Sequence, residues 1–306
     1  MALSQVALVV GASRGIGRQI ALDLGQNGYH VAVAAKSISE AYQTHPFPPD
    51  PNSAQSTVST VAREINEASG RAIAIQVDVR NVEDVRRMVD KVIEVYGRLD
   101  VLVYNSGAIW WAEVEKTDTK RFQLMQRVNP EGLYATVQAC LPQFQLNDWK
   151  GRIIVVSPPI YSRFFRGKTA YAMGKIAMSV LTKGLAMDFE RQGRTDMAIT
   201  SIWPVVAIDS AATKDSAIKE ELRKPTIFSD AVLAMLRAPA RSLNGNLELD
   251  EDYLRRCCGV EDFSHYSLVP GTSPRRIMPA VLPDLTVTEQ LDEGRRMDST
   301  KIRQKL

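Results

Sequence analysis

The sequence predicts an α/β protein, a three-layer sandwich with a doubly wound parallel sheet between two layers of helices. Short apolar segments alternate along the chain with longer helical patterns, which is the order of a parallel sheet whose strands are joined by crossover helices. Most of these segments are hydrophobic throughout, as expected of strands buried on both faces. The 306 residues, 45% of them hydrophobic, suffice for a substantial core.

The β-rich apolar runs and the helical patterns alternate regularly along the chain. Strands are expected at 6–10, 30–35, 72–77, 100–104, 152–157 and 198–203, with a further candidate at 244–249. Helical patterns lie near 15–26, 56–69, 81–96, 119–146, 170–191 and 228–237. The Pro- and Ser-rich segment 44–56 is expected to be a loop within the domain, because the alternation resumes after it. We interpret residues 1–250 as one domain and residues 251–306 as a C-terminal extension that packs on it or trails from it.

The composition argues against several classes of protein. The 38 basic and 35 acidic residues give a net charge of only +3 without a basic stripe, which argues against nucleic-acid binding. No apolar stretch approaches the roughly 18 residues of a membrane helix. Cys140, Cys257 and Cys258 lack metal-ligand spacing, and their odd number favours a reducing compartment. No signal peptide is recognisable, so a cytoplasmic protein is expected. The C-terminal "QKL" is a weaker peroxisomal alternative.

A glycine-rich segment, "GASRGIG", connects the first strand to the first helix. Gly11, Gly15 and Gly17 let the backbone approach a pyrophosphate closely, and the helix N-terminus offers free N–H groups and a favourable dipole. The segment therefore predicts a dinucleotide site in a Rossmann-type fold. The alternative is a turn that is only structural.

Further motifs follow in a fixed order. They are "DV" at 78–79, "NSGA" at 105–108, "VN" at 128–129, "YAMGK" at 171–175 and Pro204 after the sixth strand. With the Gly-x3-Gly-x-Gly spacing, these motifs resemble the short-chain dehydrogenase/reductase family over about residues 5–250. The segments "AAKS", "SPP", "SIWP" and "YLRRCCGVEDFSHYSLVPGTSP" are similar to its hydroxysteroid dehydrogenase-like branch. Longer members of that branch carry a sterol-carrier domain, which is not expected within these 306 residues.

The end of the second strand indicates which dinucleotide binds. NAD-specific folds usually place an acid there, about 20 residues after the glycines. Here Ala35 and Lys36 occupy that place, and Arg14 lies within the glycine loop. Two cations near a 2′-phosphate favour NADP(H), although Lys36 could simply be solvated.

The resemblance also implies a set of cofactor contacts. They comprise Ser13, Ile16, Asp78, Val79, Asn105, Ser106, Gly107, Tyr171, Lys175, Pro204 and Val206, in addition to the glycines and the two cations. Asp78 could alternatively cap a helix, and 105–107 could form only a strand-end turn.

Tyr171 and Lys175 are four residues apart at the start of a helical pattern, which puts both on one helix face. A nearby ammonium and a positive nicotinamide favour the phenolate and lower the tyrosine pKa. Tyr171 is then expected to exchange a proton with the substrate oxygen. The alternative is that the two residues are neighbours on an ordinary amphipathic helix.

Two further residues are expected to assist. The resemblance implies that the carbonyl of Asn129 holds a relay water, and Pro130 either opens that carbonyl by a kink or only bends the helix. The family commonly has a serine thirteen residues before the tyrosine, where this chain has Pro158. Ser157 is the nearest hydroxyl and is the candidate oxyanion donor. Tyr161 and Ser162 are other donors nearby.

The substrate side is expected to be aromatic. Segments 108–113 and 158–169 carry Trp110, Trp111, Tyr161, Phe164 and Phe165, which form either a pocket for an apolar or aromatic molecule or part of the core. Residues 204–222 are the expected substrate lid. Val205 stands where the family commonly has glycine, which alters the lid geometry.

The sequence therefore predicts an NADP-dependent oxidoreductase that interconverts a carbonyl and a secondary alcohol of an apolar small molecule. The alternative is a repurposed family member that binds NADPH but performs a non-redox or binding role. The resemblance implies a homodimer or homotetramer assembled through the helices at 119–146 and 170–191. Neither a metal nor a nucleic-acid or membrane partner is expected.

Overall fold

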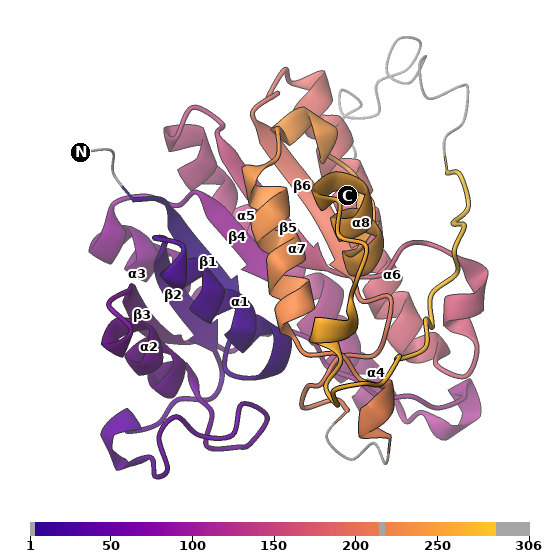
Figure 1. Cartoon of the computed structure of the whole chain (residues 1–306). Helices are drawn as coiled ribbons and strands as arrows, with labels where there is room; N and C mark the ends of the chain where they lie inside the picture. Colours follow the sequence, from indigo (N-terminus) through magenta and orange to yellow (C-terminus); the bar gives the residue numbers. More distant parts are fainter. Residues whose placement is uncertain (1–3, 214–217, 286–306) are drawn as a thin grey trace.

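One parallel sheet of seven strands organises the computed structural model, which describes residues 4–213 and 218–285 (Figure 1). The strands are β1 (Val6–Val10), β2 (His30–Ala35), β3 (Arg71–Gln76), β4 (Val101–Tyr104), β5 (Gly151–Val156), β6 (Met197–Trp203) and β7 (Leu247–Leu249). Their order is β3-β2-β1-β4-β5-β6-β7, so the direction of winding reverses between β1 and β4. Ligands of doubly wound sheets bind at such a switch point, outside the carboxyl ends of the strands.

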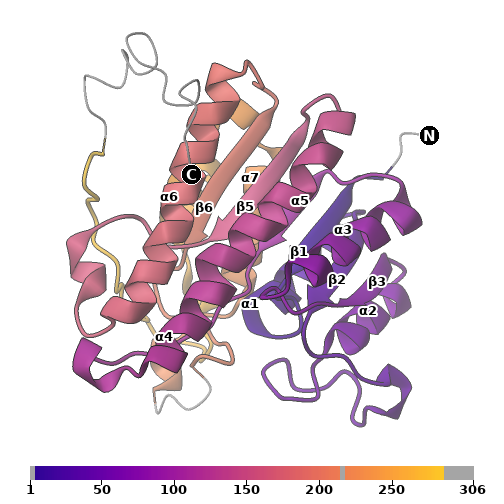
Figure 2. The same ribbon diagram turned by 180° about the vertical axis from the view of Figure 1, so that it is seen from behind.

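Helices cover both faces of the sheet, which confirms the predicted three-layer sandwich. One layer contains α1 (Gly15–Gln26), α2 (Val58–Glu67), α7 (Thr226–Arg237) and α8 (Asp250–Cys258) (Figure 1). The opposite layer contains α3 (Val82–Tyr96), α5 (Gly132–Leu146) and α6 (Thr169–Arg191) (Figure 2). No helix among the described residues is long and apolar enough to span a membrane.

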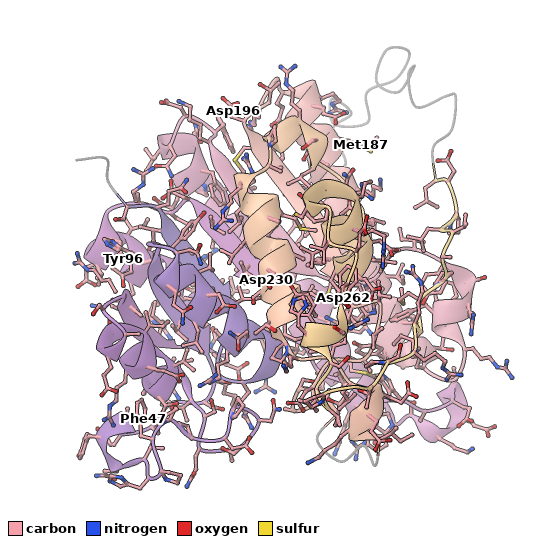
Figure 3. The ribbon with its side chains drawn as sticks, viewed as in Figure 1. Phe47, Tyr96, Met187, Asp196, Asp230 and Asp262 are labelled. Atoms are coloured by element: carbon pink, nitrogen blue, oxygen red, sulfur yellow. The ribbon has the colours of Figure 1, made fainter. Side chains whose placement is uncertain are left out.

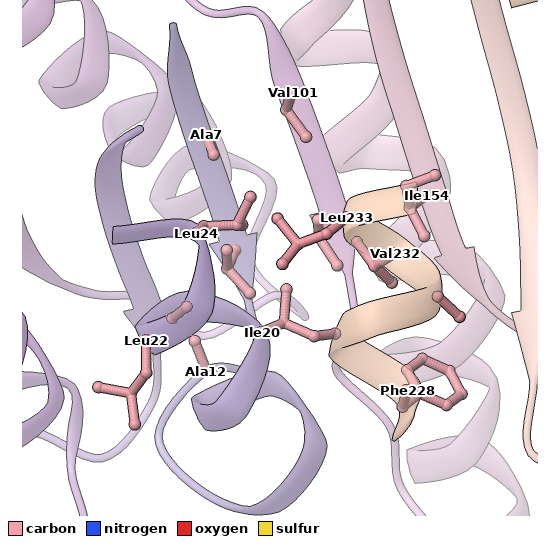
Figure 4. Close-up of a cluster of buried hydrophobic side chains, with 14 of the residues drawn as sticks. Ala7, Ala12, Ile20, Leu22, Leu24, Val101, Ile154, Phe228, Val232 and Leu233 are labelled. Atoms are coloured by element: carbon pink, nitrogen blue, oxygen red, sulfur yellow. The ribbon is translucent and has the colours of Figure 1, made fainter. Parts of the chain in front are cut away.

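The core beneath α1 and α7 lies at the centre of the fold. Figure 4 shows Ile20 and Leu24 of α1 facing Val232 and Leu233 of α7, above strands β1, β4 and β5. All four side chains are buried. On the strands beneath them, Ala7, Val101 and Ile154 are also apolar and buried, so this layer of helices packs on the sheet through a continuous apolar core.

The helices differ from the prediction in two ways, although a kink or bend at Pro130 was expected. The helix expected at 119–146 is divided into α4 (Thr119–Gln126) and α5 by a π-helical turn, Arg127–Glu131, which contains Pro130. A proline has no N–H for the helical ladder, so the backbone widens there. Helix α8 was not expected, although its acidic first turn and Gly259, a left-handed C-cap, are helix signals.

The segment after α8 returns to the domain. Phe263 and Tyr266 are buried in the cluster beneath α1 and α7. Arg276 forms a two-pronged ion pair with Asp252 of α8, at 2.6 and 2.7 Å. The chain then runs beside α6 (Figures 1 and 2). Residues 286–306, including "QKL", lie outside the described residues.

Asp250 ties the start of the expected lid to α8. Its Oδ1 accepts hydrogen bonds from the backbone N–H groups of Val205 at 2.8 Å and Glu251 at 2.7 Å. Its Oδ2 is buried without a hydrogen-bond partner among the described residues. Burial raises the pKa of Asp250 to about 7 and outweighs the two backbone hydrogen bonds, which lower it.

Asp250→Asn is expected to stabilise the protein at alkaline pH. The pKa of Asp250 is higher in the folded protein than in the unfolded chain. Between about pH 4 and 7, the folded protein therefore holds a proton that the unfolded chain has lost. The free energy of unfolding falls as the pH rises through this range. Asparagine keeps one acceptor oxygen without the charge. Thermal unfolding at pH 8 is expected to show a gain of about 1–3 kcal/mol that shrinks towards pH 5. Exposed Asp90→Asn is the control; equal effects of both variants would refute this account.

Candidate active site

The glycine loop and the end of β4 meet at the switch point of the sheet. Asn105 Nδ2 donates a hydrogen bond to the carbonyl oxygen of Gly11 at 2.9 Å. Gly11 has a φ of +87°, and a Cβ there would lie 2.5 Å from the backbone nitrogen of Ser106. Only glycine allows this approach. The structure therefore brings together the predicted cofactor residues at 11–17 and 105–107.

Basic side chains gather at the end of β2. Arg14 donates a hydrogen bond to Ser37 Oγ at 3.2 Å, and Lys36 Nζ lies 3.4 Å from Asp78. The Arg80 guanidinium binds the same carboxylate and holds the Asp78 pKa well below its usual range. Lys36 and Arg80 thus flank the Asp78 carboxylate, and Arg14 binds the neighbouring Ser37.

A cavity of about 500 Å³ lies beside this corner, and its lining includes Lys36, Ser37, Thr57 and Gln76. The lining is rich in hydroxyl and amide groups, which suit a phosphate. Asp78 does not cap α3, because Asn81 Oδ1 accepts the N–H groups of Glu83 and Asp84.

The loop at 44–56 packs against the glycine loop, which the sequence did not predict. The carbonyl oxygen of Pro51 accepts a hydrogen bond from the Gly15 N–H at 3.2 Å, and Ser56 Oγ donates to the carbonyl oxygen of Ser13 at 2.7 Å. Asn52 Nδ2 donates to Asp209 Oδ2 at 3.1 Å, so the loop also reaches the lid. The length and position of the insertion after β2 were the available signal.

The tip of this loop lies beyond the carboxyl ends of the strands. Phe47 marks this lower edge of the molecule in Figure 3, and Asp196, just before β6, marks the opposite edge. The guanidinium carbon of Arg63 in α2 lies 3.9 Å from the centre of the Phe47 ring and holds the loop on the helix.

Two predicted catalytic residues, Lys175 of α6 and Asn129 of the π turn, converge on Gly107. A Cβ on Gly107 would lie 3.5 Å from Lys175 Nζ and 3.6 Å from Asn129 Oδ1. Lys175 Nζ donates to the carbonyl oxygen of Val156 at 2.7 Å. The Asn129 side chain exchanges two hydrogen bonds with the backbone of Ala108, at 2.8 and 3.1 Å. It thereby fixes the loop after β4 against the helix.

Burial shifts both ionisable groups towards their neutral forms. Tyr171 and Lys175 are each only 3% exposed. In the protein alone, desolvation raises the pKa of Tyr171 and lowers the pKa of Lys175 to about 7, and the predicted lowering of the Tyr171 pKa beside a bound nicotinamide stays a prediction. In the protein alone, Tyr171 is therefore a phenol at neutral pH, able to donate a proton.

Ser157 is fully buried and turned towards α6. Its Oγ lies 2.9 Å from Ser179 Oγ, which also lies 2.6 Å from the carbonyl oxygen of Pro158. Ser179 follows Tyr171 by about two helical turns. Ser157 Oγ is the acceptor of the bond from Ser179, so its own O–H can still donate, and its role as an oxyanion donor stays a prediction. Tyr161, one of the two other predicted donors, donates its hydroxyl hydrogen to the Met278 sulfur at 3.2 Å.

Aromatic rings surround Tyr171. The ring centre of Phe164 lies 6.2 Å from that of Tyr171, and the ring centre of Trp111 lies 6.4 Å from it. Trp203, which was not predicted, packs edge-on against Phe164 at 5.8 Å. Its signal was the aromatic residue ending β6, directly before Pro204.

The three other aromatic residues predicted for the substrate side are not among the ring contacts of Tyr171. Tyr161 lies 5.9 Å from Phe164, centre to centre. Trp110 packs under the Arg121 guanidinium at 3.5 Å. Phe165 is 37% exposed and makes none of the ring contacts found within residues 4–213 and 218–285.

The start of the predicted lid is anchored on both sides. Besides the bond to Asp250, Val205 accepts a hydrogen bond at its carbonyl oxygen from the Ile277 N–H at 2.9 Å. Val205 and Val206 are buried. Residues 214–217 of the lid lie outside the described part of the chain.

Sequence comparison places these features in a known family. The short chain dehydrogenase family model matches residues 5–46 and 52–221. Hydroxysteroid dehydrogenase-like protein 2 of Bos taurus is 34% identical over 287 residues, which cover 92% of this chain and 63% of the relative. The Homo sapiens protein of the same name is 34% identical over 268 residues, covering 86% and 60%. The chain thus spans less than two thirds of the length of these relatives.

Solved structures agree with this placement. A putative dehydrogenase from Xanthomonas campestris has a TM-score of 0.78 and 33% identity, covering 94% of this chain and 99% of its own. A short chain dehydrogenase from Mycobacterium thermoresistibile has a TM-score of 0.77 and 33% identity, covering 90% and 94%. The chain belongs to the short-chain dehydrogenase/reductase family, in the branch of the hydroxysteroid dehydrogenase-like proteins.

Proposed function

We propose that the protein is an NADP(H)-dependent oxidoreductase that interconverts a carbonyl and a secondary alcohol of an apolar or aromatic small molecule. The observation that carries this proposal is the Tyr171 phenol, which is buried among aromatic rings one helical turn before Lys175. Family membership supports the oxidoreductase class. The nicotinamide, when bound, supplies or accepts the hydride.

Proton transfer is assigned to Tyr171. Its phenol donates a proton to the substrate oxygen as the carbonyl is reduced, and its phenolate removes the alcohol proton in the opposite direction. Lys175 stabilises the phenolate through its ammonium. The side chain of Asn129 keeps the loop at Ala108 in place beneath the reacting groups. The rings of Trp111 and Phe164 exclude water from the phenol.

The corner at the end of β2 supports NADP(H). Arg14 and Lys36 are placed to bind a 2′-phosphate, and Ser37 adds a hydroxyl. Asp78 does not reverse this preference, because Arg80 and Lys36 already neutralise it. The N–H groups of Gly11 and Ala12 are bonded to the carbonyl oxygen of Ala34, and that of Gly15 to Pro51, so the pyrophosphate is assigned to the N-terminus of α1.

Carbonyl reduction is expected to slow as pH rises through about 7. The raised pKa of Tyr171 keeps its phenol protonated before the reaction, so the supply of the proton does not change over this range. Lys175 loses its own proton near pH 7, and the Tyr171 phenolate that remains after proton transfer then lacks a positive neighbour. Initial rates with saturating NADPH, measured between about pH 5 and 9, test this. Lys175→Met is expected to be slow and flat over the same range. A wild-type rate that rises with pH would contradict the assignment.

The test of the proposed function is stoichiometric product formation. Wild-type protein is incubated with NADPH and a panel of aromatic ketones, and NADPH oxidation is compared with the alcohol measured by mass spectrometry. One alcohol per NADPH supports the proposal. The second candidate, a family member that binds NADPH without redox chemistry, is favoured by the complete burial of Ser157, the predicted oxyanion donor. Tight NADPH binding without any alcohol would establish it.

We also propose a cytoplasmic homodimer or homotetramer that uses α4, α5 and α6. Leu124, Tyr134, Met173 and Val180 are exposed apolar residues on these helices. Exposed apolar side chains gathered on neighbouring helices support a subunit contact. Residues 251–285 are proposed to be part of the same folding unit as residues 1–250, because Phe263 and Tyr266 lie in its core.

A further inference from the structure

The loop that leads into α6 carries positive charge without a compensating acid. Segment 158–169, "PPIYSRFFRGKT", contains Arg163, Arg166 and Lys168 and no Asp or Glu. Arg163 and Arg166 are exposed, whereas Lys168 is half-buried. Lys168 directly precedes α6 and lies three residues before Tyr171.

The Lys168 ammonium faces the aromatic rings that surround Tyr171. Its Nζ lies 4.7 Å from the centre of the Phe164 ring and 5.6 Å from the centre of the Trp111 ring. Both rings also contact Tyr171, at 6.2 and 6.4 Å between centres. The ammonium therefore lies on the edge of the cluster in which the substrate carbonyl would react.

No carboxylate of residues 4–213 and 218–285 forms an ion pair with Lys168. Neighbouring cations differ, since Lys116 pairs with Glu113 at 3.1 Å and Arg121 with Asp118 at 3.3 Å. Burial alone lowers the pKa of Lys168. A partly desolvated cation is costly unless a counter-charge meets it, and ring faces compensate only in part.

We propose that Lys168 binds an anionic group of the substrate, so that the substrate is an apolar carbonyl compound that also carries a carboxylate. This inference rests on the proposed carbonyl chemistry at Tyr171. A carboxylate carries a single charge, which matches one half-buried ammonium, and it accepts a charge-assisted hydrogen bond. Phe164 and Trp111 contact the apolar part, and Lys168 sets the distance between the carboxylate and the reacting carbonyl.

The test uses acids and neutral amides of the same shape. Benzoylacetate, benzoylpropionate and benzoylbutyrate vary the distance between the ketone and the carboxylate, and each is compared with its primary amide. We expect wild-type protein to prefer at least one acid over its own amide by about 10- to 100-fold in kcat/KM, the range of a charged hydrogen bond. Lys168→Met is expected to abolish this preference while the amides react as before, and Lys168→Arg to retain part of it.

Lys183→Met is the matched control. It removes the same charge from α6, about 22 Å further along the helix. Retained turnover of the amides shows that Lys168→Met remains folded. An acid preference that is absent in the wild type, or unchanged in Lys168→Met, overturns the inference and leaves the proposed function intact.

A binding measurement separates the inference from the proposed function. The same six compounds are titrated against the NADP⁺ complex, and quenching of tryptophan fluorescence reports binding near Trp111. If NADPH is not oxidised with any of the six compounds, the proposed function fails for this class of ketone. The inference is still supported if an acid binds more tightly than its amide and Lys168→Met abolishes that difference. Equal binding of acids and amides contradicts it.

Discussion

Replacement of Tyr171 by phenylalanine is expected to lower kcat for carbonyl reduction about 10²- to 10⁴-fold, the usual contribution of a positioned general acid. The phenol is buried and its pKa is raised by desolvation, so it is the protonated donor at neutral pH. Phenylalanine keeps the ring that packs against Phe164 and Trp111. The affinity for NADPH and the thermal stability are therefore expected to change little.

Single-turnover NADPH oxidation measures this loss without interference from product release. Tyr134→Phe is the matched control. This substitution removes a phenol hydroxyl from a tyrosine that is 58% exposed on α5. Unchanged turnover in Tyr171→Phe, with the control also unchanged, would show that another group supplies the proton.

The cofactor preference is expected to reverse when the cations at the end of β2 are removed. Arg14→Ala combined with Lys36→Asp takes away both groups placed for a 2′-phosphate and restores the acid that favours a ribose hydroxyl. The ratio of kcat/KM for NADPH to that for NADH is expected to fall about 10²-fold or more, because charged hydrogen bonds are lost and repulsion is added.

Steady-state kinetics with both nucleotides at low and high salt measure this ratio. Salt is expected to weaken the wild-type preference, since Lys36 is largely exposed and its attraction to phosphate is screened. Arg86→Ala, at an exposed surface ion pair on α3, serves as the control. A ratio that stays constant in the double variant would mean that NADP(H) is not selected at this corner.

The sequence predicted the fold because the responsible signals are local. Strands such as β1 are apolar at every position, and the glycine loop follows β1 directly. The four-residue spacing of Tyr171 and Lys175 likewise fixes their common helix face. Such patterns depend on backbone geometry that neighbouring residues determine.

Other features depend on contacts between distant segments. The direction of the Ser157 hydroxyl follows from Ser179, which is 22 residues away, and the bond between Asn52 and Asp209 spans 157 residues. The raised pKa of Tyr171 in the protein alone arises from burial in the assembled cluster. Side-chain direction and desolvation are set by tertiary packing, so the sequence carries no periodic signal for them.

The central claim is that Tyr171 protonates a carbonyl that NADPH reduces. Deuterium transfer tests this claim most directly. Protein is incubated with a mixed carbonyl extract and NADPH deuterated at the transferable position, and labelled alcohols are sought by mass spectrometry. We expect labelled alcohol with the wild type and about 10²- to 10⁴-fold less with Tyr171→Phe in equal time. Absence of labelled alcohol with NADPH-saturated wild type, or equal labelling by both proteins, would contradict the claim.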